Sequence, residues 1–134
     1  MSLVIYAVSK FYGEVQAVVN VDLEIQEGEF FTLLGPSGCG KTSLLRIVSG
    51  LELPDSGQVL LDRKDMTMTP ASKRPVNTVF QSYALFPHMT VVENVAYGLL
   101  SKKVPKAEAM DRSRKALSLV RLDGFDKRYP HPIS

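Results

Sequence analysis

The chain has 134 residues, of which 16 are basic and 14 acidic, giving a net charge of +2. This length allows one domain with a sizeable core and excludes two full-sized ones. Hydrophobic residues make up 45% and charged residues 22%, as is typical of a soluble globular protein. The single cysteine excludes an internal disulfide framework, and no apolar run approaches the roughly 18 residues of a membrane span.

The first third of the chain predicts strands. The run LVIYAV, residues 3–8, is the first of them. In AVVNVDLEI, residues 17–25, every second position is apolar, which predicts a half-buried strand. The apolar positions are Ala17, Val19, Val21, Leu23 and Ile25. The run FFTLL, residues 30–34, does not alternate and predicts a strand that is buried on both faces.

A helix is predicted to follow. From Lys41 onward, apolar residues recur at helical spacing, at Leu44, Leu45, Val48 and Leu51. The stretch LPDSG, residues 53–57, ends this helix, and short strands are predicted at residues 58–62 and 76–80. The middle of the chain therefore contains a strand–loop–helix unit.

The last third predicts two helices. TVVE, residues 90–93, fits a capping box and predicts a helix from Val91 to about Leu100. A second helix is predicted within residues 104–122 and is ended by Gly124. Its expected apolar side is formed by Ala109, Ala116, Leu117 and Val120.

The stretch GPSGCGKTS, residues 35–43, fits the phosphate-binding pattern G-x-x-x-x-G-K-[ST] between the predicted strand and helix. Glycines let the backbone turn its N–H groups toward phosphate oxygens, and the helix start adds its positive dipole end. Lys41 is expected between the β- and γ-phosphates, Thr42 on Mg²⁺ and Ser43 on the α-phosphate. The remaining predicted cofactor-binding positions are Gly35, Ser37, Gly38, Cys39 and Gly40.

An ordinary glycine-rich turn is the alternative interpretation of this stretch. It is disfavoured because strand, helix and the extra Gly38 all accompany the motif. The cysteine is expected to be a bystander whose thiol takes no part in phosphoryl transfer. His88 and His131 stand alone and do not predict a metal site.

Three stretches together resemble the ATP-binding subunits of ABC transporters. LLGPSGCGKTSLLRIVSGLELPDSGQV resembles their Walker A region. RPVNTVFQSYALFPHMTVVENVAYGL resembles their Q-loop and the start of their helical subdomain, and FYGEVQAV resembles their adenine-stacking loop. The similarity runs over essentially the whole chain and is strongest to subunits of bacterial spermidine and putrescine importers.

The resemblance implies an α/β fold of the P-loop NTPase class, an ABC-type nucleotide-binding domain that is truncated. Residues 1–88 would form the N-terminal part of the nucleotide-binding core. Residues 89–134 would begin the helical subdomain. Bound ATP and Mg²⁺ are the implied cofactors.

Two site residues rest on the resemblance. Tyr12 lies where the family stacks an aromatic ring on adenine, although by itself it reads as a half-exposed tyrosine at a strand end. Gln81 lies at the Q-loop position, where the family's amide reaches Mg²⁺ and the attacking water. It is therefore expected in both the catalytic and the metal set, and its alternative is a polar residue that ends a strand.

The implied partners are membrane-spanning permease subunits and a second ATP-binding subunit, at the cytoplasmic face of the cell membrane. Residues 86–89, FPHM, lie where the family receives a short helix of the permease, and a buried loop is an equally good interpretation. Residues 101–134 carry 9 basic and 4 acidic side chains, a net charge of +5. This segment has no interleaved aromatic residues on which bases could stack. We therefore interpret it as a solvated helix face and expect no nucleic-acid partner.

After RYPH, residues 128–131, the family continues with Gln and then with a Leu-Ser-Gly-Gly-Gln signature. In this chain Pro132 replaces that Gln, and Ile133 and Ser134 fall on the first two positions of the signature. The signature, the Walker B aspartate, the glutamate that activates water and the switch histidine all lie further on in the family. We therefore expect a fragment of a longer subunit whose exposed sheet edge is covered by another copy. The function implied by the resemblance is ATP binding by the energy-coupling subunit of a polyamine importer, in which hydrolysis by the full-length subunit drives uptake. The alternative function is a module that binds nucleotide without hydrolysing it.

Overall fold

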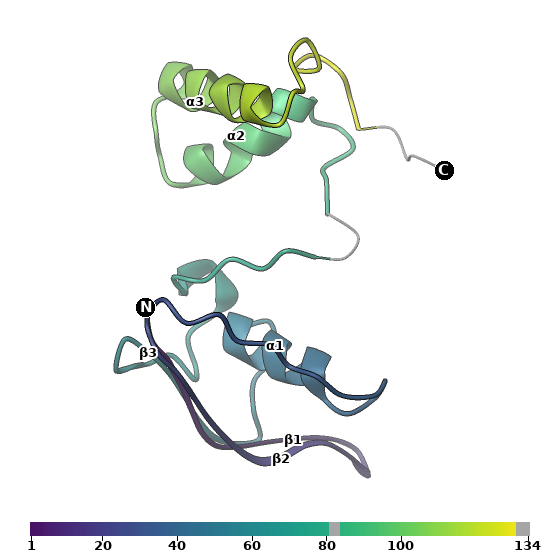
Figure 1. Cartoon of the computed structure of the whole chain (residues 1–134), viewed down its shortest axis with the longest axis vertical. Helices are drawn as coiled ribbons and strands as arrows, with labels where there is room; N and C mark the ends of the chain where they lie inside the picture. The colour runs from purple at the N-terminus through teal and green to yellow at the C-terminus, as the bar shows by residue number, and fades with distance from the viewer. Residues whose placement is uncertain (81–83, 131–134) are drawn as a thin grey trace. The chain divides into compact units, whose positions relative to one another are not determined.

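The computed structural model describes residues 1–80 and 84–130, and Gln81 lies outside the described residues. The chain forms two compact units, Met1–Thr78 and Val79–Ser134 (Figure 1). No helix in the described part of the chain is both long and apolar enough to cross a membrane.

The first unit is built on an antiparallel sheet with the strand order β2-β1-β3-β4. The strands are β1 (Leu3–Tyr12), β2 (Val15–Ile25), β3 (Ser56–Leu61) and β4 (Lys64–Asp65). Helix α1 (Lys41–Ser49) packs on one face of this sheet (Figure 1). A short 3₁₀ helix, η1 (Ala71–Lys73), follows β4 in the chain. The core between helix and sheet consists of Ile5, Val8, Val18, Leu44, Ile47 and Val59.

Strands β1 and β2 contain paired irregularities that change which side chains face the core. Ala7 and Asn20 have positive φ angles of 48° and 46°, and the register shifts beside both. Asn20 N–H donates to Ser9 Oγ at 2.9 Å. As a result Val18 is buried, whereas Val19 is 53% exposed. The predicted alternation of buried and exposed residues therefore holds from Val21 to Ile25. The prediction that Val19 faces the core is wrong, because a β-bulge shifts the alternation by one residue.

Two predicted strands are absent from the described structure. Residues 30–34 form no strand, and Phe30 and Leu34 are 92% and 88% exposed, so the prediction of a doubly buried strand is wrong. Residues 76–80 also form no strand. An apolar strand of this kind needs neighbours on both sides that satisfy its backbone groups, and the described sheet contains only β1 to β4.

Helix α1 is confirmed, with a buried side that differs in part from the prediction. Leu44 and Ile47 are buried, whereas Leu45 and Leu51 are 56% and 44% exposed. The helix ends at Gly50, whose φ of 76° allows its N–H to reach back to the last helical turn.

The second unit contains α2 (Val91–Ser101) and α3 (Lys106–Leu119), which lie side by side (Figure 1). The capping box is confirmed, since Thr90 N–H donates to Glu93 Oε2 at 2.8 Å and Glu93 N–H donates to Thr90 Oγ1 at 3.4 Å. Helix α3 ends at Leu119, five residues before the predicted end at Gly124. Its buried line is Ala109, Ser113 and Leu117, while the predicted Ala116 and Val120 are exposed.

Candidate functional site: the phosphate loop

The phosphate loop, residues 35–43, leads into α1, which begins at Lys41. Gly40 occupies the N-cap position with a φ of 87°, and a Cβ there would lie 2.0 Å from Ala17 O. Only glycine fits this position, because any side chain would collide with the backbone of β2. Gly38 also has a positive φ, 82°, but its surroundings are open.

The Lys41 side chain turns back into the loop. Its Nζ donates to Gly35 O and Pro36 O, each at 2.7 Å, and lies 3.3 Å from Cys39 Sγ. The ammonium group is thus held by backbone carbonyls at the centre of the loop rather than extended into solvent. Cys39 is a free, exposed cysteine.

The N-terminus of α1 suits an anion. Gly40 offers no side-chain cap, and the first turn of the helix, which is described in full, contains no acidic residue. The first N–H groups of a helix have no intrahelical acceptor, and the helix dipole places partial positive charge there. Together with Lys41, these amides form a positively polarised cradle for phosphate oxygens.

An open pocket of about 370 Å³ lies over this cradle. It brings the predicted Tyr12 together with most of the phosphate loop, and its lining consists of Tyr12, Val15, Ala17, Ser37, Gly38, Gly40, Lys41, Thr42 and Ser43. Gly35 and Cys39 do not line it, although both contact the Lys41 ammonium. Sequence reasoning missed Val15 and Ala17, although their place directly after the β1–β2 turn could have indicated them.

Tyr12 is 44% exposed and lies at the end of β1. The Lys10 ammonium is 5.5 Å from the centroid of its ring and makes ion pairs with Glu52 and Asp55, each at 3.3 Å. Asp55 also accepts a hydrogen bond from Phe11 N–H at 2.6 Å. The strand end that carries the aromatic ring is therefore anchored to the loop after α1.

Potential metal ligands are not clustered in the described part of the chain. The described residues contain no group of three or more His, Cys, Asp or Glu side chains that could hold a metal ion. Thr42, an exposed residue of the pocket lining, carries a hydroxyl oxygen of the kind that Mg²⁺ takes as a ligand. Among the described residues that line the pocket, none carries a carboxylate or imidazole that could add to this hydroxyl as a metal ligand.

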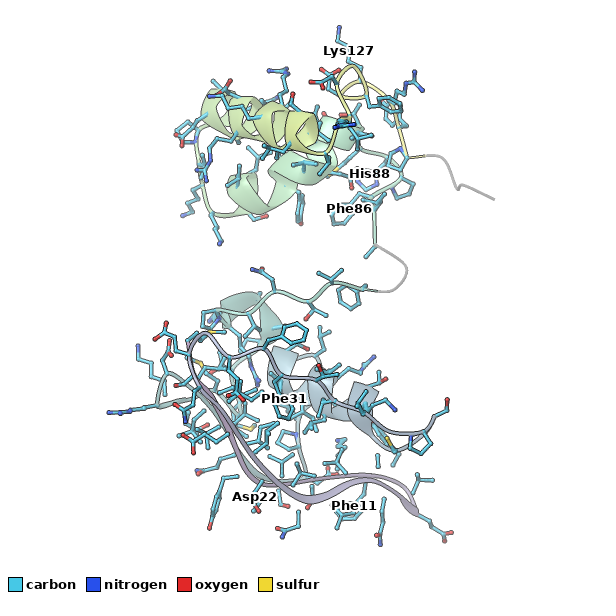
Figure 2. The ribbon with its side chains drawn as sticks, viewed as in Figure 1. Phe11, Asp22, Phe31, Phe86, His88 and Lys127 are labelled. Carbon is cyan, nitrogen blue, oxygen red and sulfur yellow. The ribbon has the colours of Figure 1, made fainter. Side chains whose placement is uncertain are left out.

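Residues 86–89 form an exposed turn in the second unit. Pro87 and His88 are exposed, while Phe86 and Met89 are partly buried. Phe86 and His88 lie close together (Figure 2), with ring centroids 6.0 Å apart. The Phe86 ring centroid also lies 4.7 Å from that of Tyr97.

The side chain of Asn94 holds this turn in shape. Its Oδ1 accepts from Phe86 N–H at 2.8 Å. Its Nδ2 donates to the carbonyls of Phe86 and Met89, each at 3.1 Å, and of Thr90 at 3.0 Å. The turn is thus fixed from α2 while its tip faces solvent.

Comparison with known proteins agrees with the motif. A family model described as ABC transporter matches residues 18–134. The spermidine/putrescine import ATP-binding protein PotA of Nitrosomonas eutropha is 60% identical over 123 residues, covering 92% of this chain and 34% of that protein. PotA of Escherichia coli K12 is 54% identical over 127 residues, covering 95% and 34%. The chain spans about a third of the length of these relatives.

Solved structures show the same similarity. The dimeric structure of MJ0796, described as a bacterial ABC transporter cassette, is 31% identical with a TM-score of 0.84, covering 98% of this chain and 63% of that one. A post-hydrolysis state of the same cassette bound to ADP and Pi is 30% identical with a TM-score of 0.79 and covers the same shares. The fold is that of an ABC-type nucleotide-binding domain, of which the chain covers a part. With a family model that matches most of its length, the chain belongs to the ABC transporter family.

Proposed function

We propose that the chain binds ATP as part of the energy-coupling subunit of an ABC importer for polyamines. The observation that carries this proposal is the pocket in which the Lys41 ammonium, the first amides of α1 and the Tyr12 ring face a common space. The similarity to PotA proteins supports polyamines as the transported class.

Each part of the pocket has a role in this proposal. The triphosphate lies over the phosphate loop, where the amides of residues 38–43 donate to its oxygens and Lys41 supplies the positive charge. Among the described residues that line the pocket, Lys41 is the only one with a cationic side chain. Tyr12 offers its ring to the adenine, a contact worth about 1–3 kcal/mol by analogy with base stacking on aromatic side chains.

Magnesium would join through Thr42, whose hydroxyl lies in the pocket lining. When bound, the ion would neutralise negative charge on the phosphates. Gln81, which lies outside the described residues, is proposed as a further ligand and as the residue that positions water.

The partners are proposed on the same basis. Membrane-spanning permease subunits would dock on residues 86–89, where an exposed turn is held by Asn94. A second ATP-binding subunit is supported by the dimeric cassette structures that the chain resembles. Such an assembly would place the chain at the cytoplasmic face of the cell membrane.

Nucleotide binding without hydrolysis is the second candidate, favoured by the composition of the pocket. None of its lining residues in the described structure is an Asp, Glu or His. Phosphoryl transfer to water depends on positioning that water and neutralising developing charge. The described part of the site has groups that would bind the phosphates, but no side chain that would position the attacking water.

The Lys41→Ala variant tests the proposal. Because it removes the cationic side chain from the pocket, we expect its affinity for Mg-ATP to fall at least about tenfold, as for loss of a charged hydrogen bond worth about 1.5–3 kcal/mol. A fluorescent ATP analogue, displaced by Mg-ATP, measures this. Lys73→Ala, which removes an exposed lysine of η1, is the matched control and should bind as the wild type does.

Unchanged affinity in Lys41→Ala would remove the assignment. Phosphate release from ATP tests the second candidate. The chain alone should give the background rate, and turnover that Lys41→Ala abolishes would favour a complete ATPase.

A further inference from the structure

Arg74 is a buried charged residue that the phosphate loop does not contact. It follows η1, is 5% exposed and makes no ion pair within the described residues. Its guanidinium donates instead to four backbone carbonyls. These are Ile47 O at 2.8 Å and Val48 O at 2.9 Å from one nitrogen, and Thr69 O at 2.7 Å and Thr67 O at 2.9 Å from the others.

Two of these acceptors belong to the last turn of α1, the helix that begins in the phosphate loop. The final carbonyls of a helix lack intrahelical donors and carry partial negative charge, so a cation there is favourable. The planar guanidinium can serve several carbonyls at once, which a lysine ammonium cannot do with the same geometry. Burial lowers the pKa of Arg74, an effect that the nearby Asp65 carboxylate partly offsets.

Gly50 completes this contact. A Cβ at Gly50 would lie 2.5 Å from Arg74 Nε and 2.9 Å from Ala71 N. The glycine therefore ends the helix with its positive φ and also leaves room for the guanidinium. Such a close fit fixes the end of the helix against the segment from Thr67 to Arg74.

The length of α1 makes this fixation relevant to the site. The helix has nine residues, too few to be stable without tertiary contacts. At 1.5 Å per residue, it is a short rigid rod, so tilting one end displaces the other. The donors that face the pocket lie in the first turn of α1. Arg74 donates hydrogen bonds to carbonyls in its last turn.

We propose that Arg74 is a positioning residue for nucleotide binding, which holds the C-terminal end of α1 so that the Lys41, Thr42 and Ser43 amides keep their place under the triphosphate. This inference rests on the proposed function. It separates triphosphate recognition, which depends on α1, from adenosine recognition, which depends on Tyr12 at the end of β1.

The test compares two ligands on the full 134-residue chain. Arg74→Gln should bind Mg-ATP about tenfold more weakly, a change of 1.4 kcal/mol, while its affinity for adenosine changes less than twofold. Arg74→Lys keeps the positive charge but lacks the planar guanidinium. Its affinity for Mg-ATP should lie between those of Arg74→Gln and the wild type. Lys73→Gln, the exposed neighbour, should match the wild type for both ligands.

A residue with only a structural role would lower the melting temperature and leave both affinities of the folded protein unchanged, or weaken both equally. Either result overturns the inference. Where Arg74→Gln does not fold, as judged by circular dichroism, Arg74→Lys decides by the same comparison of ligands. If wild-type protein binds no Mg-ATP, the proposed function itself fails. If it binds and the Arg74 variants bind equally well, only this inference fails.

Discussion

Single residues decide the shape of the phosphate loop, and Gly40 shows this most directly. Replacing Gly40 with Ala places a Cβ 2.0 Å from Ala17 O at a φ of 87°. Because both the collision and the strain must be relieved, we expect a loss of more than about 3 kcal/mol in unfolding free energy and loss of Mg-ATP binding. Urea unfolding and nucleotide titration measure the two effects.

Gly38→Ala is the matched control for this substitution. Gly38 has a similar φ of 82°, but no atom of the described residues would lie within 4 Å of an added methyl group. The unfolding free energy of Gly38→Ala should therefore fall only by the cost of backbone strain, about 1 kcal/mol. Equal stability of the two variants would show that the close approach to β2 is not what requires glycine at position 40.

The capping box of α2 predicts a pH dependence. Hydrogen bonds from Thr90 N–H and then from the Thr90 hydroxyl lower the pKa of Glu93 from its ordinary value of 4.5. Because the folded-state pKa is depressed, the contribution is complete above pH 4.5 and is lost as the pH falls through the lower folded value. Glu93→Gln should thus be less stable than wild type at pH 7, and the difference should shrink in acid.

Unfolding curves of both proteins between pH 3 and pH 7 check this expectation. Glu14→Gln, which alters an exposed turn residue, is the control. It is preferred to Glu108→Gln, because Glu108 pairs with Arg112. A difference between Glu93→Gln and wild type that stays constant over this range would contradict the assigned cause.

At the scale of elements, Asn94 connects α2 to the turn at residues 86–89. Asn94→Ala removes the acceptor of Phe86 N–H and the donor to three carbonyls. We expect a loss of about 1–3 kcal/mol, since partly buried backbone groups lose their partners. Faster hydrogen exchange at the Phe86 amide is the direct readout.

Ser101→Ala, at the exposed end of the same helix, is the control and should leave that exchange rate unchanged. If the Phe86 amide exchanged at the same rate in Asn94→Ala as in wild type, the turn would be held by contacts other than this side chain.

Sequence patterns predicted the elements that carry their own local signals. The capping box gave the start of α2, and the motif around Lys41 gave the phosphate loop and the start of α1. The phase of β2 was predicted only beyond Asn20, because a bulge that depends on the neighbouring β1 has no local signature. For residues 30–34 the composition indicated a strand, but strand formation also requires neighbours.

The same limit applies within the site. Lys41 and Gly40 belong to a contiguous motif, so its spacing alone was enough to select them as candidate phosphate-binding residues. Arg74 contacts α1 across 26 and 27 positions of sequence, and nothing beside it in the chain indicates that contact. A buried arginine whose partners are all carbonyls becomes recognisable only in three dimensions.

At the scale of the whole molecule, the first unit exposes large apolar side chains to solvent. Phe30 and Leu34 are largely exposed. They come directly before and after residues 31–33, which line a groove of about 320 Å³ together with residues of β1, β2 and α1. The lining of this groove is mainly apolar. Exposed apolar patches beside unpaired backbone favour association.

We therefore expect the isolated chain to self-associate in a concentration-dependent way. Phe30→Glu combined with Leu34→Glu should reduce this association, whereas Leu119→Glu, on an exposed position of the second unit, should not. Size-exclusion chromatography over a range of concentrations measures it. A stable wild-type monomer at all concentrations would contradict the expectation.

Nucleotide binding at the phosphate loop is the property on which the proposed function and the role of Arg74 both depend. Titration calorimetry of the folded chain with Mg-ATP measures it without a label or a coupled reaction. We expect saturable heat at one site per chain, lost in Lys41→Ala. Absence of saturable heat in folded wild-type protein, or an equal signal in Lys41→Ala, would contradict the assignment.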